Sequence, residues 1–361
     1  MSRLLWVGGA ATAVTAVAVG SHYLLSRYSA QASQGSSSST AQLHMLTTAT
    51  ATPTMDVVFV HGLGGSTNGT WTNKQGVLWA RDWLHDDAPA WRVLAYDYPN
   101  DPTHWNAHPS TMRLKDVGDE ALLLLRLDGV GTRPFVLVGH SMGGLVNKAI
   151  MLAAKDLAGA KPGTAPDEDV KHAKAFVSNL RGIVFLGTPH RGAAAADIAR
   201  YLDSLLIGLG RVAGNLQNLQ LLAPHIHDLN NAFGRCGVRA LSLGESVPTH
   251  GVVIVQRESS QMGIPSETYA QLGGKNHFDM SRPDDKQDSL YRLVLEFLKK
   301  AEAKTEALPA LPAPSGPQRS LYEYEEKYRS VQESLFKLIK LQREHPFPEF
   351  AQYVVYLEHA V

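Results

Sequence analysis

The sequence predicts an α/β fold with a mostly parallel sheet, and two observations support this prediction. Short apolar runs alternate with segments of helical periodicity, a pattern typical of parallel strands joined by crossover helices. The runs are apolar on both faces, as strands covered by helices on both sides require. We expect strands at 56–61, 92–97, 135–139, 182–187, 238–243 and 252–256, and helices at 77–85, 111–127, 142–157 and 289–300.

Composition divides the chain into five parts. An apolar segment over 1–29 is followed by a Ser/Thr-rich linker over 30–55, and the α/β domain is expected over 56–300. Within that domain, 161–169 is a polar insertion and 193–222 is expected to form a helical lid. An Ala/Pro-rich linker over 301–320 then leads to a tail over 321–361, where Leu321–Arg343 has a charged, amphipathic helical pattern, typical of a solvated helix that packs on itself or on a protein partner.

The N-terminal segment is expected to be a membrane anchor. Leu4–Ser26 contains no Asp, Glu, Lys or Arg, is flanked by Arg3 and Arg27, and approaches the length of about 20 apolar residues that crosses a bilayer. A cleaved signal peptide usually has a shorter apolar core, and a mitochondrial presequence has more arginines. A mitochondrial and an endoplasmic-reticulum address both remain open.

Charge and cysteine content exclude several classes of function. Lys plus Arg and Asp plus Glu both total 34, so there is no net charge to attract nucleic acid. Cys236 is the only cysteine, which excludes an internal disulfide framework and a cysteine-based zinc site. It lies in a loop before a strand-like run, where we interpret it as a structural or incidental thiol. Motifs for metal, nucleoside triphosphate and dinucleotide binding are missing, so we expect no cofactor and no metal.

The strongest chemical signal is Gly139-His140-Ser141-Met142-Gly143, which follows an apolar strand and leads into a helix. Gly-x-Ser-x-Gly in this setting is the nucleophile elbow of the α/β-hydrolase fold. A serine in such a tight turn projects its hydroxyl clear of the backbone, and the glycines let strand and helix approach closely. We therefore predict that Ser141 is the nucleophile and that the Met142 amide donates to the oxyanion.

The glycine-rich stretch over 61–65 follows the first strand, where this fold places the second donor of the oxyanion hole. We expect that donor to be the backbone N–H of Leu63, with Gly62 as the alternative. His61 is interpreted as a structural histidine rather than a catalytic one.

The general base is expected after the last strand of the fold. His277 lies in a loop between the final expected strand and the closing helix, and it is the predicted base. His190, in Gly-Thr-Pro-His-Arg-Gly, follows an earlier strand and is expected to shape the site instead.

The triad acid is expected between the elbow and the base, directly after a strand. Glu245 follows the run over 238–243 and is the predicted acid. Glu258 is the alternative, and Asp228 and Asp197 are weaker candidates.

Several segments together resemble one family. They are HGLGG from His61, GVLWARDW from Gly76, VLAYD from Val93, GHSMGGLVNKA from Gly139, GIVFLGTPHRG from Gly182 and VQRESSQMG from Val255. Over about residues 56 to 300, the chain is similar to the serine-active-site-containing protein family and to the lipase-like domains ahead of fungal nucleotide-binding receptors.

The resemblance implies lipid hydrolysis or acyl transfer, and for anchored members an association with mitochondrial or endoplasmic-reticulum membranes and phosphatidylglycerol remodelling. By position, it supports Ser141 as nucleophile and His277 as base. It also favours Glu245, which precedes the pair Pro248-Thr249. The surroundings of His277, Asn-His-Phe-Asp-Met, depart from the family's usual Asp/Asn-His-x-x-Ile/Val-Cys.

These observations together predict a membrane-anchored serine hydrolase or acyltransferase whose substrate is a lipid or another acyl ester. Two alternatives remain at this stage. A catalytically silent scaffold could use the fold to recruit a partner through Leu321–Arg343, and a protein deacylase would need an accessible pocket. A triad by itself fits any ester, thioester or amide.

Overall fold

The computed structural model describes residues 40–47, 52–100, 113–190, 223–249 and 251–303. Within these residues, seven strands form one sheet in the order β1-β3-β2-β4-β5-β6-β7, and β1 alone among them runs antiparallel to its neighbour. The strands are β1 (Gln42–Thr47), β2 (Met55–Val60), β3 (Trp91–Asp97), β4 (Phe135–His140), β5 (Leu180–Leu186), β6 (Ala240–Gly244) and β7 (Glu267–Gln271).

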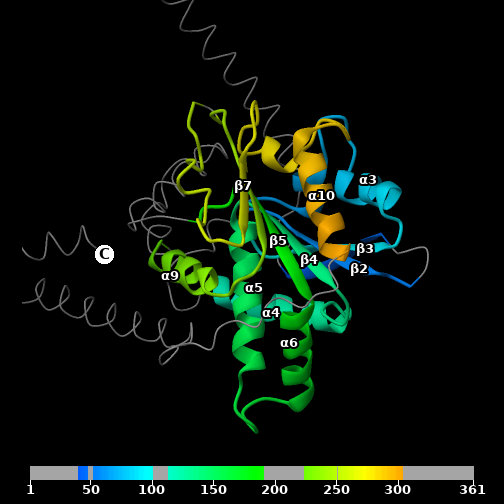
Figure 1. Cartoon of the computed structure of the whole chain (residues 1–361), viewed down its shortest axis with the longest axis vertical. Helices are drawn as coiled ribbons and strands as arrows, with labels where there is room; N and C mark the ends of the chain where they lie inside the picture. Colours follow the sequence, from blue (N-terminus) through cyan, green and yellow to red (C-terminus); the bar gives the residue numbers. More distant parts are fainter. Residues whose placement is uncertain (1–39, 48–51, 101–112, 191–222, 250, 304–361) are drawn as a thin grey trace, which may run out of the picture.

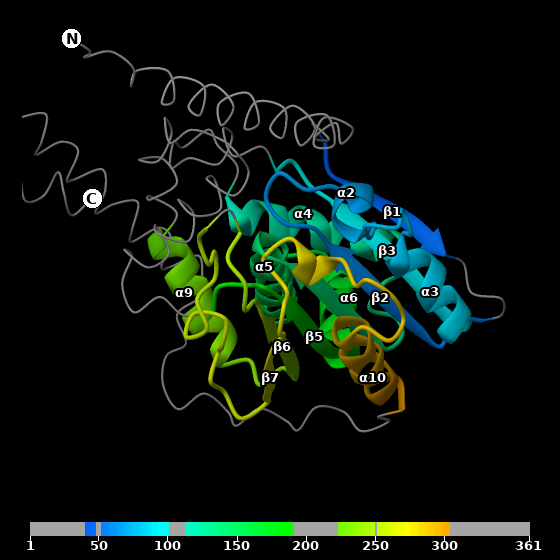
Figure 2. The ribbon, with the colours of Figure 1, turned by 90° about the horizontal axis from the view of Figure 1, so that it is seen from above.

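Helices cover both faces of the sheet (Figures 1 and 2). One face carries α4 (Leu114–Leu127), α5 (Met142–Ala158), α6 (Asp167–Asn179) and α9 (Ala223–Gly234). The other face carries α3 (Trp79–Asp87) and α10 (Ser289–Ala303), and the short α2 (Thr67–Trp71) follows β2. This arrangement confirms the predicted α/β fold with a mostly parallel sheet.

Each face of the sheet has its own hydrophobic core. The central strands β2 and β4 are buried along their whole length, which explains why their sequences are apolar at nearly every position. On the α3/α10 face, Phe59 meets Trp71 and Trp79 edge to face, at ring-centroid distances of 4.9 Å and 5.3 Å. These contacts hold the loops after β2 against the body of the domain.

Two strands differ from the sequence-based prediction. β1 lies inside the segment expected to be a linker over 30–55, so the sheet begins before residue 56. The prediction of a strand at 252–256 is wrong, and the last strand among the described residues is β7. β7 was missed because it is an edge strand whose residues are half-buried or exposed, which weakens the apolar signal. Helix α6 was also not predicted.

Several sequence-based expectations lie outside the residues that the structure describes. They are the anchor at Leu4–Ser26, most of the linker over 30–55, the lid over 193–222, the Ala/Pro-rich linker over 301–320 apart from residues 301–303, which end α10, and the helix at Leu321–Arg343. Within the described ranges, no helix is both long enough and apolar enough to cross a membrane.

Candidate active site

Ser141 sits in a strained turn between the end of β4 and the first residue of α5. Its backbone has φ 54° and ψ −122°, and it is the one non-glycine residue of positive φ in the part of the chain that the structure covers. Such a conformation costs of order 1–3 kcal/mol and persists only where neighbours enforce it. The Ser141 amide donates to the Leu186 carbonyl at 2.8 Å, and Thr188 Oγ1 donates to the Ser141 carbonyl at 3.1 Å. Strand β5 and the loop after it therefore hold the turn.

Glycines let three backbones meet around this serine. A Cβ on Gly62 would lie 3.0 Å from Ser141 Cβ, so the loop after β2 passes directly beside the serine side chain. A Cβ on Gly143 would overlap the carbonyl oxygens of Val60 and His61, at the end of β2. The elbow glycine is therefore required by the close packing of α5 on β2.

A continuous hydrogen-bonded chain links Ser141, His277 and Glu245. His277 Nε2 lies 2.9 Å from Ser141 Oγ, and His277 Nδ1 lies 2.6 Å from Glu245 Oε2. All three residues are at most 1% exposed. They come from the carboxyl ends of β4 and β6 and from the loop after β7, the edge at which open parallel sheets carry their sites. The structure thus brings together the three residues predicted as nucleophile, base and acid.

Glu245 is also held by main-chain donors. Its Oε1 accepts from the amides of Ile254 and Val255 at 2.6 Å and 3.1 Å. One carboxylate oxygen is therefore committed to the backbone, and the other faces the imidazole. Of the alternative acids, Glu258 is exposed, Asp228 lies half-buried on α9, and Asp197 is outside the described residues.

His140, the variable position of the elbow motif, supports the backbone of His277. Its Nε2 lies 2.9 Å from the His277 carbonyl oxygen, so this nitrogen carries a proton and donates. Burial, and next the charge on His277, lower the pKa of His140 well below its usual value, which keeps the ring neutral. Thr249 adds a second brace, since its Oγ1 accepts from the His277 amide at 3.1 Å. The sequence motif alone did not indicate either role.

The two expected oxyanion donors lie on the turn itself, at Met142, and on the loop that passes beside the serine, at Leu63. Met142 and Leu63 are both buried, and among the described residues no acceptor is paired with either backbone amide. Both amides therefore remain available to a ligand oxygen. The loop that carries Leu63 is anchored by Asn100, which accepts from the Gly64 amide at 3.1 Å and donates to the Gly65 carbonyl at 2.5 Å.

His61 is part of the same anchoring. Its ring stacks on Tyr98 at 4.6 Å, and its Nε2 lies 3.3 Å from Asp97 Oδ1. Burial works to raise the pKa of Asp97, but hydrogen bonds from His61 and Thr67 outweigh it and hold that pKa below its usual value. These contacts agree with a structural role for His61. Asp97, Tyr98 and Asn100 were not singled out from sequence, since a polar cluster after a strand has no motif.

His190 lies close to this site but in a different cluster. Its Nδ1 is 2.7 Å from Nζ of the fully buried Lys148, and its Nε2 is 3.3 Å from Ser242 Oγ. The structure therefore places His190 behind the elbow rather than beside Ser141 Oγ. Cys236 is buried, and burial raises the pKa of its thiol, which disfavours the nucleophilic thiolate.

The arrangement can perform nucleophilic acyl chemistry. A hydroxyl on a strained turn faces an imidazole, the imidazole faces a buried carboxylate, and unpaired backbone amides lie on the turn and on the loop beside it. Within the part of the chain that the structure describes, no three His, Cys, Asp or Glu side chains are grouped so that they could hold a metal ion.

Part of the chain is similar in sequence to known proteins. The chain is 30% identical to Protein SERAC1 of Danio rerio over 276 residues, which cover 68% of this chain and 39% of that protein. It is 29% identical to Protein SERAC1 of Homo sapiens over 277 residues, which cover 69% of this chain and 39% of that protein. The chain therefore spans about two fifths of the length of these relatives.

Solved structures with a similar course include the lipase BlEst2 of Bacillus licheniformis, at 18% identity and a TM-score of 0.46, covering 72% of this chain and 98% of that one. Another is a thermophilic esterase of Thermogutta terrifontis, at 14% identity and a TM-score of 0.40. The match covers 72% of this chain and 99% of that one. A model of the alpha/beta hydrolase family matches residues 57–285, which include the whole Ser141–His277 site. The chain therefore belongs to the alpha/beta hydrolase family.

Proposed function

We propose that this protein is a serine hydrolase that cleaves or transfers the acyl group of an ester, with Ser141 as nucleophile, His277 as general base and Glu245 as the acid that orients the base. The observation that carries the proposal is the hydrogen-bonded chain among these residues, 2.9 Å and 2.6 Å long at its two links. Each distance is within the range that proton transfer and imidazole orientation require.

In the acylation step, His277 Nε2 takes the hydroxyl proton while Ser141 Oγ bonds to the acyl carbon. The carbonyl oxygen becomes an oxyanion that the Leu63 and Met142 amides stabilise, a contribution of about 10² to 10³ in rate for each donor. The carbon–oxygen bond to the leaving alcohol then breaks, and the imidazolium returns its proton to that alcohol. Glu245 stabilises the imidazolium and remains ionised.

Deacylation repeats these roles with a second nucleophile. His277 deprotonates a water molecule or the hydroxyl of an acceptor, which attacks the acyl-enzyme and releases a free acid or a new ester. The serine is nearly inaccessible, being 1% exposed. Because this burial limits the access of water to the acyl-enzyme, hydrolysis would be slowed relative to attack by a bound acceptor. We therefore extend the proposal to acyl transfer.

A lipid ester is the substrate class that we propose, at a mitochondrial or endoplasmic-reticulum membrane. The apolar Leu4–Ser26 segment supports a membrane location for the chain, and the family resemblance described above favours a lipid.

Labelling with a fluorophosphonate probe tests the proposed chemistry directly. Wild-type protein in membranes should label covalently, and both Ser141→Ala and His277→Ala should abolish labelling because one removes the nucleophile and the other its activation. Ser242→Ala is a control, since this buried serine contacts His190 rather than His277 and should leave labelling intact.

Two outcomes would redirect the interpretation. A folded, membrane-bound wild type that resists the probe would favour the scaffold, with the fold used for protein recruitment through the Leu321–Arg343 segment. Labelled protein should next be compared on phospholipid esters, p-nitrophenyl esters and an acylated peptide. Turnover of the acylated peptide alone would favour a protein deacylase and refute the lipid assignment.

A further inference from the structure

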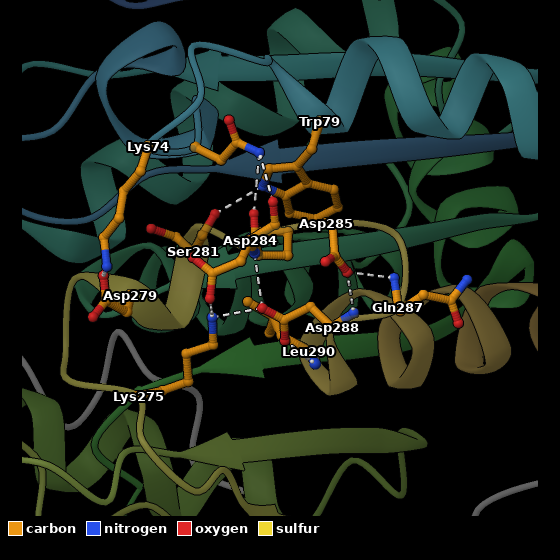
Figure 3. Close-up of polar contacts among 12 residues, drawn as sticks. Lys74, Trp79, Lys275, Asp279, Ser281, Asp284, Asp285, Gln287, Asp288 and Leu290 are labelled. Atoms are coloured by element: carbon orange, nitrogen blue, oxygen red, sulfur yellow. Dashed lines mark hydrogen bonds and ion pairs between the residues drawn. The ribbon is translucent and has the colours of Figure 1, made fainter.

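The loop that carries His277 is braced by a polar cluster that the proposed chemistry does not use. This loop runs from residue 272, after β7, to residue 288, before α10, and it includes the short 3-10 helix η2 (Asp279–Ser281). Figure 3 shows Lys275 reaching toward Asp284 and Asp288 at the far end of the loop, with Trp79 and Ser281 beside them.

Lys275 joins the two ends of the loop. Its Nζ lies 2.8 Å from Asp284 Oδ2 and 2.5 Å from Asp288 Oδ2, and the residue is only 8% exposed. Burial works to lower the pKa of Lys275, but the hydrogen bonds to these two carboxylates outweigh it and raise that pKa above its usual value. The ammonium is therefore fully charged near neutral pH.

Asp288 is a rigid partner for this ammonium. Its side chain is 6% exposed and accepts from the amides of Asp284 at 2.8 Å and Leu290 at 2.9 Å. The second of these bonds caps the N-terminus of α10, a helix packed against the sheet. Through Asp288, Lys275 is thus fixed to the body of the domain, in addition to its bond with the half-exposed Asp284.

The main chain of Lys275 contacts the segment that carries the acid. Its carbonyl oxygen accepts from the amides of Ser246 at 3.0 Å and Val247 at 3.1 Å, the two residues directly after Glu245. Two residues further along the loop is His277. The side chain of Lys275 therefore contacts the residue that caps α10, its carbonyl contacts the segment directly after Glu245, and it lies two residues before His277.

We infer that Lys275 is a positioning residue for the triad. It fixes the His277 loop and the Glu245 segment relative to one another by connecting both to the start of α10. The inference rests on the proposed function of Ser141, His277 and Glu245. It adds a residue that touches neither substrate nor the reacting atoms.

Loss of this brace should slow the chemistry while leaving the fold in place. Trp79 Nε1 still donates to the Ser281 carbonyl at 2.8 Å, and Asn73 Nδ2 to the Pro283 carbonyl at 3.2 Å, so the second half of the loop keeps its anchors. A displacement of about 1 Å at a reacting group can lower the rate by about 10². We therefore expect Lys275→Met to lower the fluorophosphonate labelling rate about 10- to 100-fold.

The chain offers a matched control in Lys286. Its Nζ also contacts two carboxylates, Asp86 at 3.2 Å and Asp87 at 3.0 Å, and it also ties this loop to a helix, but its contacts are distant in sequence from His277 and Glu245. Lys286→Met also removes contacts with two carboxylates, at a side chain that is 35% exposed against 10% for Lys275, and should leave the labelling rate within about twofold of wild type. Comparing the two variants at a temperature where both are folded separates positioning from general loss of stability.

The experiment measures labelling rate, kcat and KM for a p-nitrophenyl ester, and thermal unfolding, on the full chain in wild type, Lys275→Met, Lys275→Arg and Lys286→Met. Slow labelling and a low kcat in Lys275→Met, a KM within about threefold of wild type, and partial recovery in Lys275→Arg would support the inference. If Lys275→Met does not fold, Asp284→Asn removes one of the two carboxylate partners at a half-exposed side chain and should lower the rate several-fold.

Wild-type labelling rates in folded Lys275→Met, or in Asp284→Asn where that variant is needed, would overturn the positioning role and leave the triad proposal intact. Equal losses in Lys275→Met and Lys286→Met would also overturn it, because they would show a general effect of loop stability. Failure of the wild type to label would refute the triad proposal itself, and the role of Lys275 with it.

Discussion

Replacing Glu245 with Gln is the most informative single change in the proposed triad. Oε1 accepts from two backbone amides, at 2.6 Å and 3.1 Å, and Oε2 faces His277 Nδ1 at 2.6 Å. A glutamine has one acceptor oxygen and one NH2 group, so it cannot serve both sides as the carboxylate does.

The backbone amides decide how the glutamine would turn. If its NH2 group faced them, two buried donors would lose their acceptor at about 1–3 kcal/mol each. The oxygen therefore stays on the amides, and the NH2 group faces His277 Nδ1. The imidazole must then carry its proton on Nε2, where it cannot accept the proton of Ser141. An amide at this position in serine triads lowers kcat by about 10⁴, which corresponds to about 5.4 kcal/mol in activation free energy.

The assay is the second-order rate of fluorophosphonate labelling, with ester hydrolysis as a second readout and urea unfolding to check the fold. We expect a loss of about 10³ to 10⁴ in rate with little change in stability, because the side chains are nearly isosteric. Glu258→Gln is the control, since Glu258 is exposed and should label as wild type does. A folded Glu245→Gln protein within about tenfold of the wild-type rate would refute the assignment of the acid.

Three further changes test the framework around the site. Gly143→Ala should cost about 3 kcal/mol in urea unfolding, because its Cβ would overlap the Val60 carbonyl oxygen; a neutral effect would contradict the close packing of helix on strand. His140 is neutral in the fold and protonated when unfolded in acid, so the unfolded state binds the extra proton. Stability should therefore fall by up to about 1.4 kcal/mol per pH unit below about pH 6.5, and His140→Gln should flatten this dependence in urea titrations across that range. Asp56→Asn should cost about 3 kcal/mol, because the carboxylate is fully buried and paired with Arg92 at 2.8 Å; unfolding within about 0.5 kcal/mol of wild type would contradict a structural role for the pair.

The central strands and the site residues were accessible from sequence because they are locally encoded. β2, β4 and β5 are apolar on both faces, and Ser141 is marked by glycines whose spacing the turn requires. Glu245 and His277 were placed by their order along the chain, since the fold brings the ends of β6 and the post-β7 loop to one edge.

The errors in strand prediction have two physical causes. One is that edge strands bury few residues, and the other is that an apolar run can be buried without forming a strand. β1 and β7 have few buried residues, so hydropathy gives little contrast. The run over 252–256 is apolar and its centre is buried, but its amides bind Glu245 Oε1 instead of a neighbouring strand. His140 lies far in sequence from the His277 carbonyl that it contacts, and the contacts of Lys275 with Asp284 and Asp288 fall within an irregular loop, so no local pattern marks either residue.

The acid's attachment to main-chain amides has a consequence for how this loop can vary between relatives. The N–H groups at positions 254 and 255 are supplied by any residue except proline, so the support does not depend on side-chain identity. Both side chains are buried, which restricts them to apolar residues of suitable size. Sequence drift can therefore exchange isoleucine, valine or leucine at these two positions while Glu245 keeps its place, whereas a proline at either position would remove one of its two main-chain donors.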